Sequence, residues 1–232
     1  MKYKLTISIS ILTILLFTGC AWFFDKNMDE KTAQELVNDG MEAFNHQQYR
    51  TAVDAFQKLK DWYPFSKYTI LAELKIADSH YYMEEYGAAA VAYESFENLH
   101  PRNDAIPYVI FQLGMSYIHQ MESIDRDQVA AKKAIEIFSR LKKSYPDSKY
   151  ASQADACIRE ATKNLAGHEF YIGEFYFKNN HYKAAVIRFK SVVADFPDVG
   201  LNQRALEYIS KCEDALAHPE KASGKPWWRK LL

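Results

Sequence analysis

Glycine and proline are scarce in this chain of 232 residues, which contains 8 and 7 of them. A composition this poor in both residues excludes a low-complexity or disordered chain. Glycine-rich and β-branched runs are also missing, whereas segments such as "AAKKAIEIFSRLKKSY" place apolar residues at helical spacing. We therefore predict an all-α protein. The formal net charge of −1 gives no electrostatic footprint for nucleic acid, so we expect no nucleic-acid partner.

Motifs that carry catalysis or bind cofactors are absent as well. No G-x-S-x-G motif, Walker-type loop or G-x-G-x-x-G motif occurs. The stretch "HEFYI" begins like a zinc-protease helix at His168, but Ile172 stands where the second histidine ligand is required. The seven histidines form no close ligand pair on one helical face. We predict no catalytic residues, no cofactor and no metal, and hence a protein that is not an enzyme.

The N-terminal segment "MKYKLTISISILTILLFTGC" differs from the rest of the chain. Two lysines precede a 13-residue apolar run over residues 5–17. As a helix this run would rise only about 20 Å, which is less than the ~30 Å hydrocarbon layer. Residues 1–19 are therefore predicted to be a signal peptide. Small residues directly before Cys20 resemble the bacterial lipobox, which implies that Cys20 is lipidated; the alternative is an ordinary signal peptide with an incidental cysteine.

Two cysteines would remain after cleavage, Cys157 and Cys212. They could pair in an oxidising compartment, but each has small or apolar neighbours at helical spacing, which favours buried free thiols. Removing residues 1–19, with two lysines and no acids, would change the net charge from −1 to −3.

A spaced pattern of small residues, an aromatic residue and proline recurs four times along the chain. Its members are Gly40, Ala52, Phe56 and Pro64; Ala77, Ala89, Tyr93 and Pro101; Gly114, Ala134, Phe138 and Pro146; and Gly173, Ala185, Phe189 and Pro197. The small residues let two helices approach closely, the aromatic residue fills the space between repeats, and the proline ends the second helix. The pattern resembles the tetratricopeptide repeat, which implies a superhelix of four complete helical hairpins plus a C-terminal capping helix.

The predicted segments follow from this repeat frame. They are the signal peptide 1–19, a linker 20–30, an array over 31–217 with repeats at about 31–64, 65–101, 102–146 and 147–197 and a cap at 198–217, and a basic aromatic tail 218–232. The eight extra residues of repeat three fall in "QMESIDRDQ", a predicted long loop. The fourteen extra residues of repeat four are expected to lengthen its first helix.

Local signals predict where several helices begin. Thr32 and Glu35 form a capping-box pattern at the start of the array. The near-identical hexapeptides "YPFSKY" and "YPDSKY" are predicted joints between repeats, in which Ser66 and Ser148 cap the next helix.

Four segments together resemble the BamD family of lipoproteins, which act in the machinery that inserts β-barrels into the outer membrane. They are "YPFSKY", "YVIFQLGMSY", "DRD" and "LAGHEFYIGEFYFKNNHYKAAVIRF". The resemblance implies a non-enzymatic adaptor that is lipid-anchored on the outer membrane of a Gram-negative bacterium and faces the periplasm. Its implied partners are the barrel-forming assembly subunit, unfolded outer-membrane barrel proteins, other assembly lipoproteins and, through the anchor, the membrane.

Candidate binding residues follow from the repeat geometry, in which first helices line a concave groove. The groove candidates are Asn45, Asp78, Tyr82 and His119, and the candidates for a partner surface are Asp125, Arg126, Asp127, Arg204 and Lys211. Asp127 has a second interpretation as the cap of the following helix. We expect repeats one to three to bind extended substrate, and repeat four with its cap to bind the barrel subunit. The alternative function is another envelope scaffold, such as a cell-division or peptidoglycan-associated coordinator.

Overall fold

The computed structural model describes residues 30–197 and 199–218. Every regular element in these residues is an α-helix, and the prediction of an all-α tetratricopeptide fold is confirmed. The helices are α2 (Ala33–Asn45), α3 (Tyr49–Trp62), α4 (Thr69–Tyr82), α5 (Tyr86–Leu99), α6 (Ile106–Ile118), α7 (Val129–Ser144), α8 (Lys149–Lys178), α9 (Tyr182–Asp195) and α10 (Asn202–Ala217). The predicted signal peptide, Cys20, the linker up to residue 29 and the tail from residue 219 lie outside the described residues.

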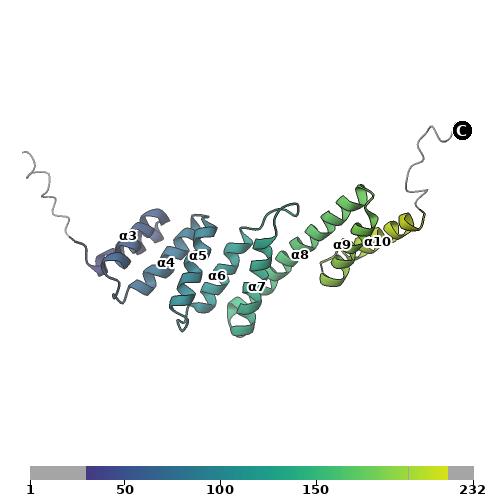
Figure 1. Cartoon of the computed structure of the whole chain (residues 1–232). Coiled ribbons are helices and arrows are strands. Elements are labelled where there is room, and N and C mark those ends of the chain that lie inside the picture. The colour runs from purple at the N-terminus through teal and green to yellow at the C-terminus, as the bar shows by residue number, and fades with distance from the viewer. Residues whose placement is uncertain (1–29, 198, 219–232) are drawn as a thin grey trace, which may run out of the picture.

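The helices form an elongated row of hairpins. Each helix packs against the next one along the chain, from α2 to α10. Figure 1 shows this order directly, with the first hairpin at one end of the row and α10 at the other. The pairs α2/α3, α4/α5, α6/α7 and α8/α9 are the four predicted hairpins, and α10 packs on α9 as the single terminal helix.

Close contact between a glycine and a phenylalanine ring holds three of the hairpins together. A Cβ atom added to Gly40 would lie 2.5 Å from a ring carbon of Phe56. The equivalent distances are 2.6 Å between Gly114 and the Phe138 ring and 2.7 Å between Gly173 and the Phe189 ring. A side chain larger than hydrogen at any of these glycines would force the two helices apart. The second hairpin has Ala77 at the glycine position and its aromatic residue is Tyr93, whose hydroxyl group has a polar role described below.

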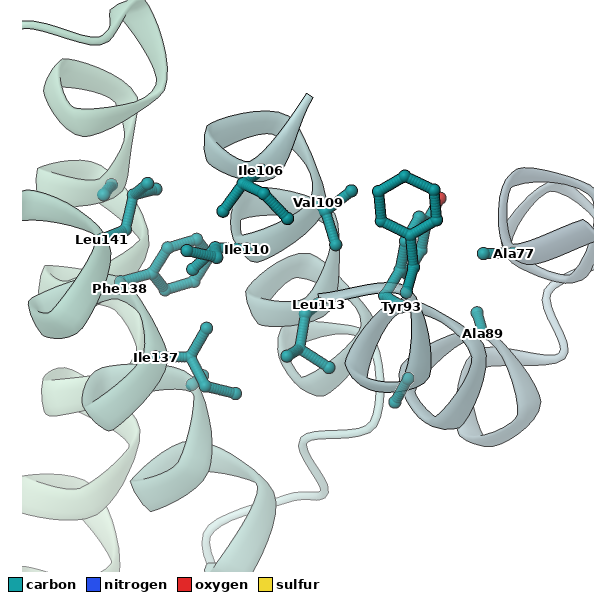
Figure 2. Close-up of a cluster of buried hydrophobic side chains, with 14 of the residues drawn as sticks. Ala77, Ala89, Tyr93, Ile106, Val109, Ile110, Leu113, Ile137, Phe138 and Leu141 are labelled. Carbon is teal, nitrogen blue, oxygen red and sulfur yellow. The ribbon is translucent and has the colours of Figure 1, made fainter. Parts of the chain in front are cut away.

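The long helix α8, with 30 residues, belongs to two hydrophobic cores. Its first half contributes Ala154 and Ala161 to the central core, which includes Tyr93 and Phe138 (Figure 2). Its second half contributes Phe170 to a separate core with α9 and α10. The additional turns of α8 therefore separate α9 and α10 from the first three hairpins.

Helix starts agree with the sequence in two of three cases. Thr32 and Glu35 form the reciprocal capping box at the start of α2, and Ser148 is the N-cap of α8. The prediction for Ser66 is wrong, because α4 begins at Thr69 and Tyr68 is its N-cap residue. The Ser66 hydroxyl group accepts a hydrogen bond from the Tyr68 amide in the turn before that helix.

Candidate binding surfaces

In three hairpins, the same kind of turn joins the first helix to the second. This turn places an aromatic ring at the end of the first helix against one at the start of the second. Gln47, Glu84 and Asn180 adopt left-handed backbone conformations, with φ near +60°. In the first hairpin the next amide, that of Gln48, donates to the Ala43 carbonyl and so closes the end of α2. The last turn of the first helix then meets the first turn of the second. The resulting ring pairs are Phe44 with Tyr49, Tyr81 with Tyr86 and Phe177 with Tyr182, with ring centroids 5.5 to 5.7 Å apart.

These pairs are joined along the first three repeats into a continuous aromatic row. We define the aromatic row as Phe44, Tyr49, Tyr81, Tyr82, Tyr86 and His119. Tyr82 stacks on Tyr49 with ring centroids 5.2 Å apart, and His119 stacks on Tyr86 at 4.5 Å. The Tyr81 ring contacts both Tyr82 and His119, and its hydroxyl oxygen lies 3.0 Å from His119 Nε2. Tyr82 and His119, two of the predicted groove residues, thus both belong to the aromatic row.

Two members of the aromatic row are open to solvent. The Tyr82 side chain is 50% exposed, and His119 is also exposed. Tyr and His have apolar faces and polar edges, so they can pack against a peptide and form hydrogen bonds with it. Asn45, at the end of α2, is exposed as well.

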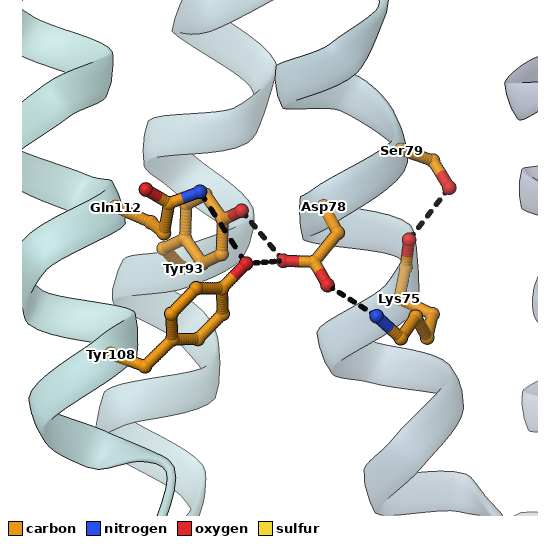
Figure 3. Close-up of polar contacts among 6 residues, drawn as sticks. All are labelled: Lys75, Asp78, Ser79, Tyr93, Tyr108 and Gln112. Atoms are coloured by element: carbon orange, nitrogen blue, oxygen red, sulfur yellow. Dashed lines mark hydrogen bonds and ion pairs between the residues drawn. The ribbon is translucent and has the colours of Figure 1, made fainter. Parts of the chain in front are cut away.

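Asp78 departs from its predicted role, because it lies beneath the surface and is only 2% exposed. Its Oδ1 atom accepts hydrogen bonds from the hydroxyl groups of Tyr93 and Tyr108, both at 2.8 Å (Figure 3). Its Oδ2 atom lies 2.8 Å from the Lys75 ammonium. The carboxylate is thus occupied by three groups from α4, α5 and α6. We correct its assignment from a groove contact to a buried support beneath the aromatic row.

Lys75 connects this support to the aromatic row. Its ammonium nitrogen lies 4.4 Å from the centroid of the Phe44 ring, while it pairs with Asp78. Burial, followed by the nearby Asp78 charge, raises the pKa of Tyr93 and of Tyr108 well above the usual tyrosine value. Both hydroxyl groups therefore remain protonated and act as donors at any physiological pH.

The long loop of the third repeat lies on the second half of α8. The Ile124 carbonyl oxygen accepts from His168 Nδ1 at 2.6 Å, and the Glu122 carbonyl accepts from the Asn164 amide at 3.1 Å. A Cβ atom on Gly167 would lie 3.0 Å from the Ile124 side chain, so the loop approaches α8 closely here. The histidine of the apparent zinc-protease motif therefore positions this loop. Sequence reasoning missed Gly167 and Asn164, because nothing in the repeat pattern marks contacts outside the hairpin.

Asp125, Arg126 and Asp127 are all exposed at the tip of this loop. The Asp127 carboxylate accepts a hydrogen bond from the Val129 amide at 2.7 Å in the turn before α7. The interpretation of Asp127 as the cap of this helix is wrong, because Gln128 is the N-cap residue of α7. Gln128, which is buried, donates to the Arg126 carbonyl and fixes the loop from below. Between the loop and α8 lies a cavity of about 300 Å³, lined in part by these residues.

The last helix presents two cations over aromatic rings. The Arg204 guanidinium lies 4.6 Å from the Phe170 ring centroid and 3.6 Å from a Glu174 oxygen. The Lys211 ammonium lies 5.0 Å from the ring centroid of Tyr208, whose hydroxyl group donates to Glu174. Part of the Arg204 charge is therefore neutralised locally, which makes this surface less basic than the sequence suggests. The expected contribution of the basic tail falls on residues outside the described part of the chain.

Within residues 30–197 and 199–218, no three potential metal ligands come together, and no helix is long and apolar enough to cross a membrane. Cys157 and Cys212 are free thiols on α8 and α10. Burial raises the pKa of both thiols, so they are poor nucleophiles.

Stacked helical hairpins with recurring contacts between a small residue and an aromatic ring define a tetratricopeptide-repeat protein. A family model described as "YfiO: Outer membrane lipoprotein" matches residues 29–225, and the chain belongs to this family. The resemblance to the BamD family is thereby confirmed.

Relatives named outer membrane protein assembly factor BamD occur in several bacteria. The protein of Rickettsia prowazekii is 30% identical over 195 residues, which cover 83% of this chain and 78% of that protein. The protein of Neisseria gonorrhoeae is 25% identical, with 96% of this chain and 87% of that protein covered. The Caulobacter vibrioides protein is 28% identical over 79% of this chain, which spans 61% of its length. A solved complex of the TPR2AB domain of yeast Sti1 aligns over 82% of this chain and 76% of its own, at 17% identity and a TM-score of 0.45.

Proposed function

We propose that this protein is a non-enzymatic adaptor in the assembly of β-barrel proteins into the outer membrane. It is held on the outer membrane through lipid on Cys20 and faces the periplasm. It binds the barrel-forming assembly subunit and unfolded barrel substrates. Membership of an outer membrane lipoprotein family and the names of the relatives support the general role.

The aromatic row is the observation that carries substrate binding. It extends across the ends of three successive repeats, from Phe44 to His119, without interruption. An unfolded barrel strand presents side chains alternately on its two faces, and aromatic residues are frequent on the face destined for lipid. Tyr82 and His119 can pack against such residues and bond to the peptide backbone at the same time. We therefore assign extended substrate to repeats one to three.

We assign the barrel-forming subunit to the C-terminal end of the row of hairpins, at α10. Arg204 and Lys211 lie seven residues apart on α10, so they point to the same side of that helix. Charges at the rim of an interface accelerate association with an oppositely charged partner. Because α8 separates the two cores, a folded partner on α10 leaves the aromatic row accessible. The loop that carries Asp125 and Arg126 lies between these surfaces and suits a further assembly lipoprotein.

Paired variants test the two assignments separately. Tyr82→Ala combined with His119→Ala should weaken binding of a barrel-derived C-terminal peptide, because both anchors are removed. Co-purification with the barrel subunit from detergent-solubilised membranes should persist. Arg204→Glu combined with Lys211→Glu should have the opposite effects. Tyr171→Ala is the matched control, because this tyrosine on α8 is 43% exposed and lies outside the aromatic row.

Two outcomes would contradict the proposal. If folded forms of both double variants lose both interactions, the two surfaces are not separate. If no integral β-barrel protein co-purifies with the unaltered chain, the alternative of a different envelope scaffold is favoured.

A further inference from the structure

The joint between the first two repeats exposes large aromatic side chains. Phe65 is 100% exposed and Trp62, at the end of α3, is 46% exposed. The corresponding positions to Phe65 in the next two joints are Arg102 and Asp147, both exposed to solvent. A joint therefore folds equally well with a charged residue at this position, and its own packing does not require phenylalanine. Exposed aromatic residues that packing does not require are typical of a contact surface.

This joint lies next to the point where the chain enters the array. The Tyr63 hydroxyl group donates to the Lys31 carbonyl oxygen at 3.0 Å. Trp62 lines a cavity of about 540 Å³ together with Glu30 and Lys31, the first described residues of the chain. Cys20 precedes Glu30 by ten residues, which can span at most about 35 Å when fully extended. A lipid on Cys20 would thus keep Glu30, which lines the same cavity as Trp62, within that distance of the membrane.

Basic side chains accompany the aromatic ones. Lys58 lies one helical turn before Trp62, and Lys67 follows Phe65 by two residues with its ammonium 5.0 Å from the Tyr68 ring centroid. Neither lysine forms an ion pair within the described residues. Aromatic residues combined with lysines are typical of surfaces that lie in the interface of a phospholipid bilayer, where the rings enter the headgroup region and the ammonium groups face phosphates.

We propose that this first joint, with Trp62, Phe65, Lys58 and Lys67, rests on the phospholipid surface of the membrane that holds the lipid anchor. The inference rests on the proposed lipidation of Cys20, which supplies the tether. It also orients the array. In each of the first two repeats, the joint lies at one end of the helices and the turn inside the hairpin lies at the other end. These helices have 13 to 14 residues, so the two ends are about 20 Å apart. A joint on the membrane directs the aromatic row away from it, toward the aqueous compartment.

Photo-crosslinking in cells tests this contact with the full-length protein. A benzoylphenylalanine probe replaces Phe65 in one strain and Ile187 in another. Ile187 is the matched control because it is 66% exposed on α9, far along the row from the tether. After irradiation, mass spectrometry of the purified protein should find a phospholipid adduct at position 65 and none at position 187. An adduct to another protein, or to residues 20–30 of the same chain, would overturn the inference.

A variant addresses the contribution of Phe65 itself. Phe65→Asp copies the residue of the second hexapeptide, Asp147, so the joint should still fold. With the probe at position 62, Phe65→Asp should lower the yield of phospholipid adduct by about tenfold, because burial of a phenylalanine side chain changes an equilibrium at least that much. Phe65→Leu should retain most of it. Equal yields for Phe65→Asp and the unaltered chain would contradict the proposal.

Fatty-acid labelling of the same cells reports on Cys20 separately. A labelled protein without the adduct at position 65 refutes the membrane contact and leaves the anchor intact. An adduct without label supports the contact and refutes the anchor.

Discussion

Replacing Asp78 by alanine tests whether the buried polar network holds the second and third repeats together. Its carboxylate accepts from the Tyr93 and Tyr108 hydroxyl groups and pairs with Lys75, each at 2.8 Å. Asp78→Ala would leave two hydroxyl groups and an ammonium group without their shared acceptor. Removing one partner of a buried charged pair costs about 3–5 kcal/mol. We expect the free energy of unfolding to fall by about that amount.

Tyr93→Phe is the matched control for this variant. The other three repeats carry phenylalanine at the same position, so the ring itself fits. This change removes one donor, while Tyr108 and Lys75 still bind the carboxylate, and a single hydrogen bond to a charged group contributes about 1.5 kcal/mol or more. Urea unfolding followed by circular dichroism measures both variants, and equal m-values show that the same cooperative unit unfolds. If Asp78→Ala destabilises no more than Tyr93→Phe, the network is not what joins the repeats.

Four further predictions concern other parts of the chain. Ala185→Leu should lower the thermal midpoint and cost about 1–3 kcal/mol, since Ala185 is fully buried where α8 and α9 meet; an unchanged midpoint would argue against that packing. Gly167→Leu should push the long loop off α8 and speed tryptic cleavage after Arg126, as seen by mass spectrometry, and unchanged cleavage would contradict the docking. The pKa of Glu35 lies below its usual value, chiefly because the Thr32 amide donates to its carboxylate. Its stabilising contribution is present above the usual pKa of a glutamate and is lost as the pH falls through the lowered pKa. Glu35→Gln should therefore speed amide exchange in α2 at neutral pH, and the difference from the unaltered chain should vanish in acid. Cys20→Ser should abolish labelling by a radioactive fatty acid, and equal label on both forms would exclude lipidation.

The hairpins could be predicted because each depends on contacts at short sequence separation. Gly40 and Phe56 meet because sixteen residues suffice for one turn and parts of two helices, whereas Gly114 and Phe138 are 24 residues apart because the loop of the third repeat is eight residues longer. The long helix could be predicted for a related reason. An insertion of nearly four helical turns preserves which face of a helix is apolar, so α8 continues without a break.

Asp78 shows where this reasoning reaches its limit. Periodicity placed it on the inner side of α4, which is where groove residues lie. Whether a residue on that side is exposed depends on the groups that other helices bring to it, here Tyr93 and Tyr108 from α5 and α6. Those partners lie 15 and 30 residues further along the chain, and no local pattern reports a contact between them.

The amino-acid sequence by itself determined the helices, their order and the family, because helix periodicity, proline stops and small-residue contacts are local properties of the chain. Only the tertiary structure decided which surfaces these helices expose. It joined five rings from four helices, and His119 at the end of α6, into the aromatic row. It also placed the long loop on α8 and left Phe65 in solvent. Burial and ring contacts depend on distances between distant segments, and those distances exist only after the hairpins have stacked.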